Sequence, residues 1–97
     1  MAEQYHEPVE ELTAEDRDMV RSLMSLKEEI EAIIWYQQRA AAGADEELKK
    51  VLAHNRDEEI EHAVMALEWL RRNMDGWDDA CRTYLFTEKS IVELEEE

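Results

Sequence analysis

Residues 52–70 read LAHNRDEEIEHAVMALEWL, a run without glycine or proline. Successive residues of an α-helix are rotated by about 100°, so residues three, four and seven apart share a face. On that projection one apolar stripe contains Leu52, Ala63, Ala66, Leu67 and Leu70. The pattern predicts a long amphipathic helix that packs this stripe against another helix.

Start and stop signals give the bounds of this helix and predict a second long helix before it. Asp45 is the expected N-cap, and the helix should run to about residue 73. Thr13 is the expected N-cap of the preceding helix, over residues 14–41. Gly43 lies in the turn between them, where we expect a left-handed cap. The apolar stripe of the first helix contains Met19, Leu23, Leu26, Ile30 and Ile33.

The predicted fold class is all-α, with two long antiparallel helices and a short C-terminal helix. Residues 1–12 predict an extended or frayed acidic arm, and residues 13–97 a single domain. The third helix is expected over residues 77–86, and residues 91–97 are expected to form an acidic tail. Two helices joined by a short turn lie antiparallel but cannot enclose their own apolar faces. We therefore expect a second chain to complete a four-helix bundle.

The composition excludes several classes of function. The net charge is −15, with 26 acidic and 11 basic residues, so nucleic acid is not an expected partner. No apolar run is long enough for a membrane span, and the N-terminus lacks a secretory signal pattern. Cys81, the single cysteine, excludes an internal disulfide and a thiolate metal cage. We expect a cytoplasmic protein.

Glu59 falls near the middle of the apolar stripe of the second helix, within about 20° of Leu52 and Leu70. His62 lies one turn further on, about 60° away. A carboxylate on an apolar face is costly unless it is paired or bound to metal. Glu-x-x-His on a helix is also the pattern by which di-iron carboxylate bundles present ligands.

Glu29 and Tyr36 lie together at one edge of the stripe of the first helix, about two turns apart. A complete di-iron bundle uses one Glu from each of two helices and Glu-x-x-His from each of two others. This chain offers Glu29 once and the Glu59–His62 pair once. Two chains related by a two-fold axis would supply both sets, so one dimerisation completes both the bundle and the metal site.

Other interpretations stay open from spacing alone. Arg56 shares the face of Glu59, and the two could form a purely structural polar network. Glu-x-x-His also occurs at Glu3–His6, in the predicted arm, which shows that the spacing arises by chance. A second cluster on the opposite face of the first helix contains Met24, Glu28, Glu31 and Trp35. It fits either metal uptake, a subunit contact or an ordinary solvated face.

Longer motifs carry a family resemblance from about residue 6 to 93. The segment 28–36, EEIEAIIWY, and the segment 54–63, HNRDEEIEHA, resemble the two helix motifs of the encapsulated ferritins. The segments 67–72, LEWLRR, and 82–88, RTYLFTE, match as well. These motifs are more specific than a lone Glu-x-x-His.

The resemblance implies a ferritin-like ferroxidase, an oxidoreductase that converts Fe(II) to Fe(III) with dioxygen at a di-iron site shared between two subunits. It also implies a homodimer that assembles into a ring-shaped decamer. The expected partner is an encapsulin shell protein, with the enzyme inside that nanocompartment and iron storage in the shell. The chain ends in Glu95-Glu96-Glu97, without the C-terminal targeting peptide usual in the family.

The resemblance also assigns roles to individual residues. Glu29, Glu59 and His62 match the iron ligands, and Tyr36 matches the tyrosine beside the iron. Glu28 and Glu31 match acidic residues that draw metal toward the site, and Trp35 matches the aromatic residue near them. Two rivals remain: another di-metal carboxylate oxidase or peroxidase, and a non-enzymatic acidic helical adaptor in which Glu59 pairs with protein groups such as Arg56.

Overall fold

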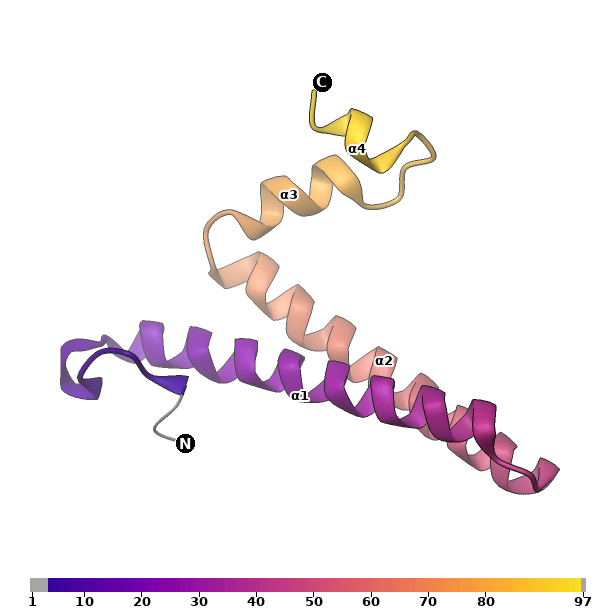
Figure 1. Ribbon diagram of the computed structural model, residues 1–97. Helices are drawn as coiled ribbons and strands as arrows, with labels where there is room; N and C mark the ends of the chain where they lie inside the picture. The colour runs from indigo at the N-terminus through magenta and orange to yellow at the C-terminus, as the bar shows by residue number, and fades with distance from the viewer. Residues whose placement is uncertain (1–3, 97) are drawn as a thin grey trace.

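The computed structural model describes residues 4–96, and these form helices and connecting turns without a strand. The elements in order are a 3-10 helix η2 (Val9–Glu11), α1 (Ala14–Ala42), α2 (Glu46–Asn73), α3 (Trp77–Tyr84) and α4 (Ile91–Leu94). Figure 1 shows α1 and α2 as an antiparallel hairpin. The two helices run side by side near their connecting turn and diverge toward the other end. The predicted all-α class with two long helices is confirmed.

Side-chain caps begin both long helices where the sequence predicts them. Thr13 accepts a hydrogen bond from the Asp16 N–H, and the Asp16 carboxylate accepts one from the Thr13 N–H, each at 3.0 Å. Asp45 accepts from the Leu48 N–H at 2.9 Å. These caps satisfy backbone donors that the first helical turn leaves without an intrahelical partner.

The left-handed cap predicted for Gly43 is wrong. Gly43 has φ −60° and ψ 144°, an extended conformation, and its N–H donates to Arg39 O at 2.9 Å. The chain therefore leaves α1 directly into the extended Asp45 cap. The left-handed glycine is instead Gly76, with φ 98°, at the sharp turn between α2 and α3.

Both predicted flanks are more ordered than expected. Leu12 O accepts hydrogen bonds at 3.2 and 2.9 Å from the Arg17 guanidinium, which anchors the arm where an extended or frayed segment was predicted. Residues 1–3, with Glu3 of the chance motif, lie outside the described range. Residues 91–94 form the short helix α4 in place of a plain acidic tail, because Leu94 is buried near α3.

The core of a single chain is very small. Among residues 4–96 only Leu70 and Leu94 are buried, whereas many large apolar side chains are exposed. The most exposed of these include Val64, Met65, Phe86, Ile91 and Val92. Within that range no helix is long and apolar enough to cross a membrane. Exposed apolar surface of this extent is typical of faces that contact another protein chain.

Candidate metal centre

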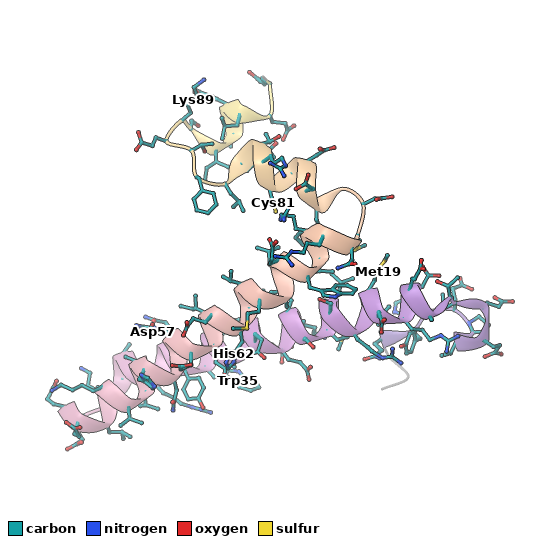
Figure 2. All side chains as sticks on the ribbon, turned by 180° about the vertical axis from the view of Figure 1, so that it is seen from behind. Met19, Trp35, Asp57, His62, Cys81 and Lys89 are labelled. Carbon is teal, nitrogen blue, oxygen red and sulfur yellow. The ribbon has the colours of Figure 1, made fainter. Side chains whose placement is uncertain are left out.

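Glu29, Glu59 and His62 converge between α1 and α2. His62 Nδ1 lies 3.5 Å from Glu59 Oε2, one turn earlier on α2, and 3.7 Å from Glu29 Oε2 on α1. One ligand atom from each residue lies within 4.8 Å of the other two. Figure 2 shows His62 on the stretch where the two helices run side by side. The hairpin therefore brings the Glu-x-x-His pair of α2 together with a carboxylate of α1.

The three side chains are arranged as a site that is open on one side. The side chains of Glu29 and Glu59 are 27% and 24% exposed, and that of His62 is 48% exposed. Each residue offers one ligand atom, so one chain supplies three donors and leaves the remaining coordination positions open. Two carboxylates and one imidazole suit iron and similar divalent metals. A cation between the carboxylates would also offset their mutual repulsion.

The open side continues into apolar surface along α2. Met65 and Trp69 follow His62 by three and seven residues, so all three share one side of the helix. Their side chains are 67% and 36% exposed. Met65 and Trp69 line a groove of about 480 Å³ between α1 and α2, together with Asp18, Arg21, Ser22, Ser25 and Ala66. A partner that covers the metal ligands would cover this groove too.

Tyr36 lies on α1 two turns beyond Glu29, at the other side of the cluster from Ser22. The Arg39 guanidinium lies over its ring, 5.5 Å from the ring centroid. The structure does not bring Tyr36 into the three-residue cluster of possible ligands. It is half-buried and lies seven residues after Glu29 on the same helix.

Glu28, Glu31 and Trp35 lie apart from the three ligand candidates. Glu28 is exposed, Glu31 is half-buried, and Trp35 is 53% exposed. Of the acidic, histidine and cysteine side chains in residues 4–96, only Glu29, Glu59 and His62 form a ligand cluster. Glu28 and Glu31 therefore form no closed cation site within one chain.

Arg56 has partners that the sequence did not reveal. Its Nη1 donates to Gln37 Oε1 on α1 at 2.8 Å, while Nε and Nη2 donate to Asp57 Oδ1 at 3.1 and 3.0 Å. In the described residues no hydrogen bond or ion pair joins Arg56 to Glu59. The Arg56–Glu59 pairing that the spacing offered is thus not formed within residues 4–96, where Glu59 lies beside His62 instead.

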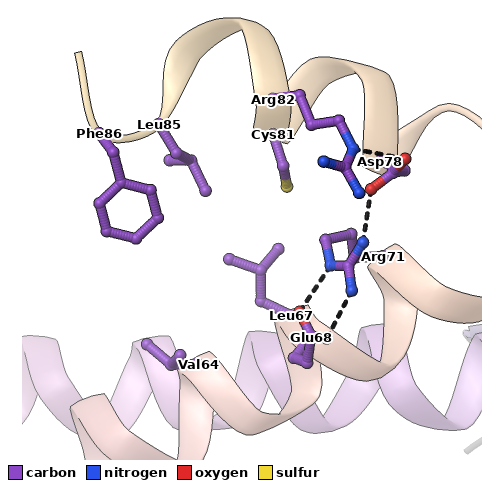
Figure 3. A pocket seen from close by; sticks show the side chains of 9 residues that line it. All are labelled: Val64, Leu67, Glu68, Arg71, Asp78, Cys81, Arg82, Leu85 and Phe86. Atoms are coloured by element: carbon purple, nitrogen blue, oxygen red, sulfur yellow. Dashed lines mark hydrogen bonds and ion pairs between the residues drawn. The ribbon is translucent and has the colours of Figure 1, made fainter.

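A second open region lies on the other flank of α2, where α3 folds back (Figure 3). This α2–α3 groove has a volume of about 500 Å³ and is lined by Val64, Leu67, Glu68, Arg71, Asp78, Cys81, Arg82, Leu85 and Phe86. Phe86 is fully exposed and has φ 59°, a left-handed conformation that is strained for a bulky residue. Residues held in such conformations cluster at functional sites such as ligand clamps and switch regions.

An ion-pair network forms one wall of the α2–α3 groove. Arg71 donates to both carboxylate oxygens of Glu68, at 2.7 and 2.8 Å, and also bonds Asp78. Arg72 donates to Glu68 at 2.7 Å, and Arg82 to Asp78 at 2.9 Å. Hydrogen bonds from Arg71 and Arg72 lower the pKa of Glu68 to about 2. The charged residues that line the groove are thus two arginines, Arg71 and Arg82, balanced by two acids, Glu68 and Asp78.

Comparison with known proteins agrees with this architecture. The EncFtn-like family model matches residues 4–88. A "Ferritin-like protein" of Thermotoga maritima is 69% identical over 97 residues, which cover all of this chain and 85% of the relative. An "Encapsulated ferritin-like protein" of Rhodospirillum rubrum is 54% identical over 90 residues, covering 93% of this chain and 64% of the relative.

A solved structure shares the fold as well. The crystal structure of a protein from Nitrosomonas europaea superposes with a TM-score of 0.85 at 55% identity, covering 90% of this chain and 96% of that one. The chain spans less than two thirds of the Rhodospirillum relative. On the family match and these identities, the chain belongs to the EncFtn-like family of encapsulated ferritins.

Proposed function

We propose that this protein is a ferroxidase whose di-iron site forms when two chains pair through the open face of the α1–α2 hairpin. The observation that carries the proposal is the convergence of Glu29, Glu59 and His62, each present once, on a face with exposed apolar neighbours. A complete di-iron bundle needs such a set twice. An isologous two-fold interface would supply it, because the same patch of each chain then faces its copy.

The proposal gives each ligand a role in the shared site. Glu59 would lie nearest the two-fold axis and bridge both metal positions. Glu29 and His62 of one chain would together bind one metal position, and the same residues of the other chain would bind the second. Carboxylates stabilise Fe(III) more than Fe(II), which favours loss of an electron from bound iron. Iron is the substrate: two Fe(II) give up one electron each, and one dioxygen accepts two electrons and two protons. Tyr36, two turns after Glu29 on α1, is the tyrosine that we propose to act beside the iron.

Surface charge would help the substrate reach the site. A net charge of −15 attracts Fe(II) and raises its local concentration, an effect that salt screens. Glu28 and Glu31, with Trp35 beside them, would draw metal toward the half-site through their carboxylates. These residues form no cluster in one chain, so this role depends on how a second chain is placed against α1.

The α2–α3 groove supports assembly beyond a dimer, including the ring-shaped decamer expected for the family. It lies on the flank of α2 away from His62, so the partner that completes the metal site leaves it open. Its charged lining residues balance one another, so this part of the surface lacks the strong negative charge of the rest of the chain. The Rhodospirillum relative is an encapsulated ferritin-like protein, which supports an encapsulin shell as partner and compartment, with iron stored in that shell.

The proposal is tested by loading Fe(II) without air, admitting air, and recording the near-ultraviolet absorbance of Fe(III). The comparison variant carries Glu59→Ala and His62→Ala. Fast oxidation by the wild type alone, with about one iron bound per chain, supports the shared site. Equal, slow oxidation by both proteins with no iron retained would refute it. Turnover of an organic substrate or peroxide in place of iron would favour another di-metal oxidase or a peroxidase.

A further inference from the structure

The proposed metal half-site is assembled from two helices, so its geometry depends on how α1 and α2 are aligned along their length. Glu29 comes from α1, whereas Glu59 and His62 come from α2. A slip of one residue moves a helix by about 1.5 Å. Metal–ligand distances tolerate only about 0.2 Å. The alignment of α1 against α2 must therefore be fixed to much less than the rise of one residue along a helix.

Apolar packing within one chain restrains this register weakly. Leu70 is the one buried residue of the two long helices, and the helices diverge toward the end where it lies. Two alanines, Ala63 and Ala66, occupy the stripe of α2 next to the cluster. Small side chains interdigitate little, so polar contacts between the helices gain importance.

Two side-chain hydrogen bonds join α1 to α2 within residues 4–96, and they bracket the metal half-site. Ser22 Oγ donates to Ala66 O at 3.3 Å on one side. On the other side Arg56 Nη1 donates to Gln37 Oε1 at 2.8 Å, the shorter of the two. Ser22 precedes Glu29 by two turns and Gln37 follows it by a little more than two.

The Arg56 guanidinium is held in place by its neighbour. Asp57 Oδ1 accepts from Nε and Nη2, which leaves Nη1 directed at α1. Figure 2 shows Asp57 on the same stretch of α2 as His62. The Arg56 side chain is only 28% exposed. A fixed, partly shielded guanidinium makes a stronger and more directional bond than a mobile surface lysine would.

We infer that the Arg56–Gln37 hydrogen bond is a tether that sets the register of α1 against α2 and thereby positions Glu29 against Glu59 and His62. Arg56 and Gln37 are positioning residues that do not touch the metal. This inference rests on the proposed function for its consequence in metal binding. The tether itself is a property of the metal-free hairpin.

Gln37→Ala separates register from charge, because it changes no charge and leaves the cation of Arg56 in place. Gln37→Ala removes the acceptor, whereas Gln37→Glu keeps a stronger acceptor and adds one negative charge. Gln38→Ala is the matched control, since the Gln38 side chain bonds Ile34 O within its own helix at 3.2 Å. The probe is Co²⁺, whose visible absorption reports the coordination geometry, titrated into the full-length protein.

We expect Gln37→Ala to lower Co²⁺ affinity about tenfold and to broaden the absorption bands. Gln38→Ala should stay within about twofold of the wild type, and Gln37→Glu should bind at least as tightly as the wild type. Wild-type binding by Gln37→Ala, or failure of Gln37→Glu to restore affinity, would overturn the inference.

A distance measurement on the metal-free protein tests the tether independently of the proposed ferroxidase activity. Spin labels are placed at Lys27→Cys and Glu61→Cys in a Cys81→Ser background, both exposed positions on the two helices, and diluted with unlabelled chain. Gln37→Ala should widen the distance distribution between the labels, and Gln38→Ala should not. If the wild type bound no Co²⁺ the metal site would fail, yet a widened distribution would still support the tether. Equal widths would overturn it.

Discussion

His62 Nδ1 lies 3.7 Å from Glu29 Oε2, across the boundary between the two long helices. Both residues belong to the same hairpin, but it encloses neither of them. The His62 side chain is 48% exposed and the Glu29 side chain 27%. We expect such a half-open pair to bind metal more weakly than a complete site made by two chains.

Loss of Glu59 should reduce Fe(II) oxidation more than loss of Glu29, because a bridging carboxylate would serve both metal positions. We expect Glu59→Ala to slow oxidation at least about 100-fold, by analogy with other displaced reacting groups. Stopped-flow absorbance of Fe(III) measures the rate. Glu58→Ala is the matched control, since Glu58 contacts His54 at 3.5 Å on the surface of α2. Equal rates for the Glu58 and Glu59 variants would contradict the bridging role.

Glu28 and Glu31 should act on the supply of iron rather than on its oxidation. Gln at both positions should raise the Fe(II) concentration for half-maximal rate a few-fold at low salt, with little change in the maximal rate. The difference should shrink as ionic strength rises, because screening weakens the attraction. The Glu10→Gln, Glu11→Gln variant loses the same charge from η2. If it behaved identically, net charge alone would explain the effect.

Phe86 should be needed for assembly beyond a dimer. Asn tolerates φ near 59° better than most residues, so Phe86→Asn removes the ring without adding backbone strain. Native mass spectrometry should show dimers in place of the larger assembly, with Phe86→Leu intermediate. An unchanged assembly in Phe86→Asn would show that the α2–α3 groove is not the contact.

The junction of α2 and α3 should weaken in acid through Glu68. The pKa of Glu68 is lowered from 4.5 to about 2, so the ionised carboxylate stabilises the fold above pH 4.5. That contribution is lost progressively as the pH falls from 4.5 toward 2. The indole N–H signal of Trp77, which donates to Met74 Sδ at 3.3 Å, reports the junction by NMR. Glu68→Gln should abolish this part of the pH dependence, and an unchanged titration would contradict it.

The sequence predicts features of the fold that have local causes. Thr13 and Asp45 cap their helices as expected, because a side-chain oxygen must meet backbone N–H groups two or three residues later. Gly43 was mispredicted because glycine is compatible with both left-handed and extended backbone, and the adjacent Asp45 cap favours the extended form. The α4 turn depends on burial of Leu94, which no local pattern reveals.

Some features of the candidate site could likewise be predicted from the sequence, and others could not. Helical periodicity places Glu59 beside His62 because both lie on one helix, and the structure also brings in Glu29 from α1. The Arg56–Gln37 bond depends on the register between two helices, which the period of either helix leaves undetermined. Periodicity places Arg56 near Glu59, so the sequence offered that pairing and gave no signal for Gln37.

The central claim is that one site is shared by two chains, and iron-edge anomalous diffraction from crystals soaked anaerobically in Fe(II) tests it most directly. The account predicts two iron peaks about 3.5–4 Å apart across a two-fold axis, with Glu29, Glu59 and His62 of both chains as ligands. Iron held by the ligands of one chain alone would contradict the account. Iron bound at other residues, with Glu59 paired only to His62, would contradict it as well.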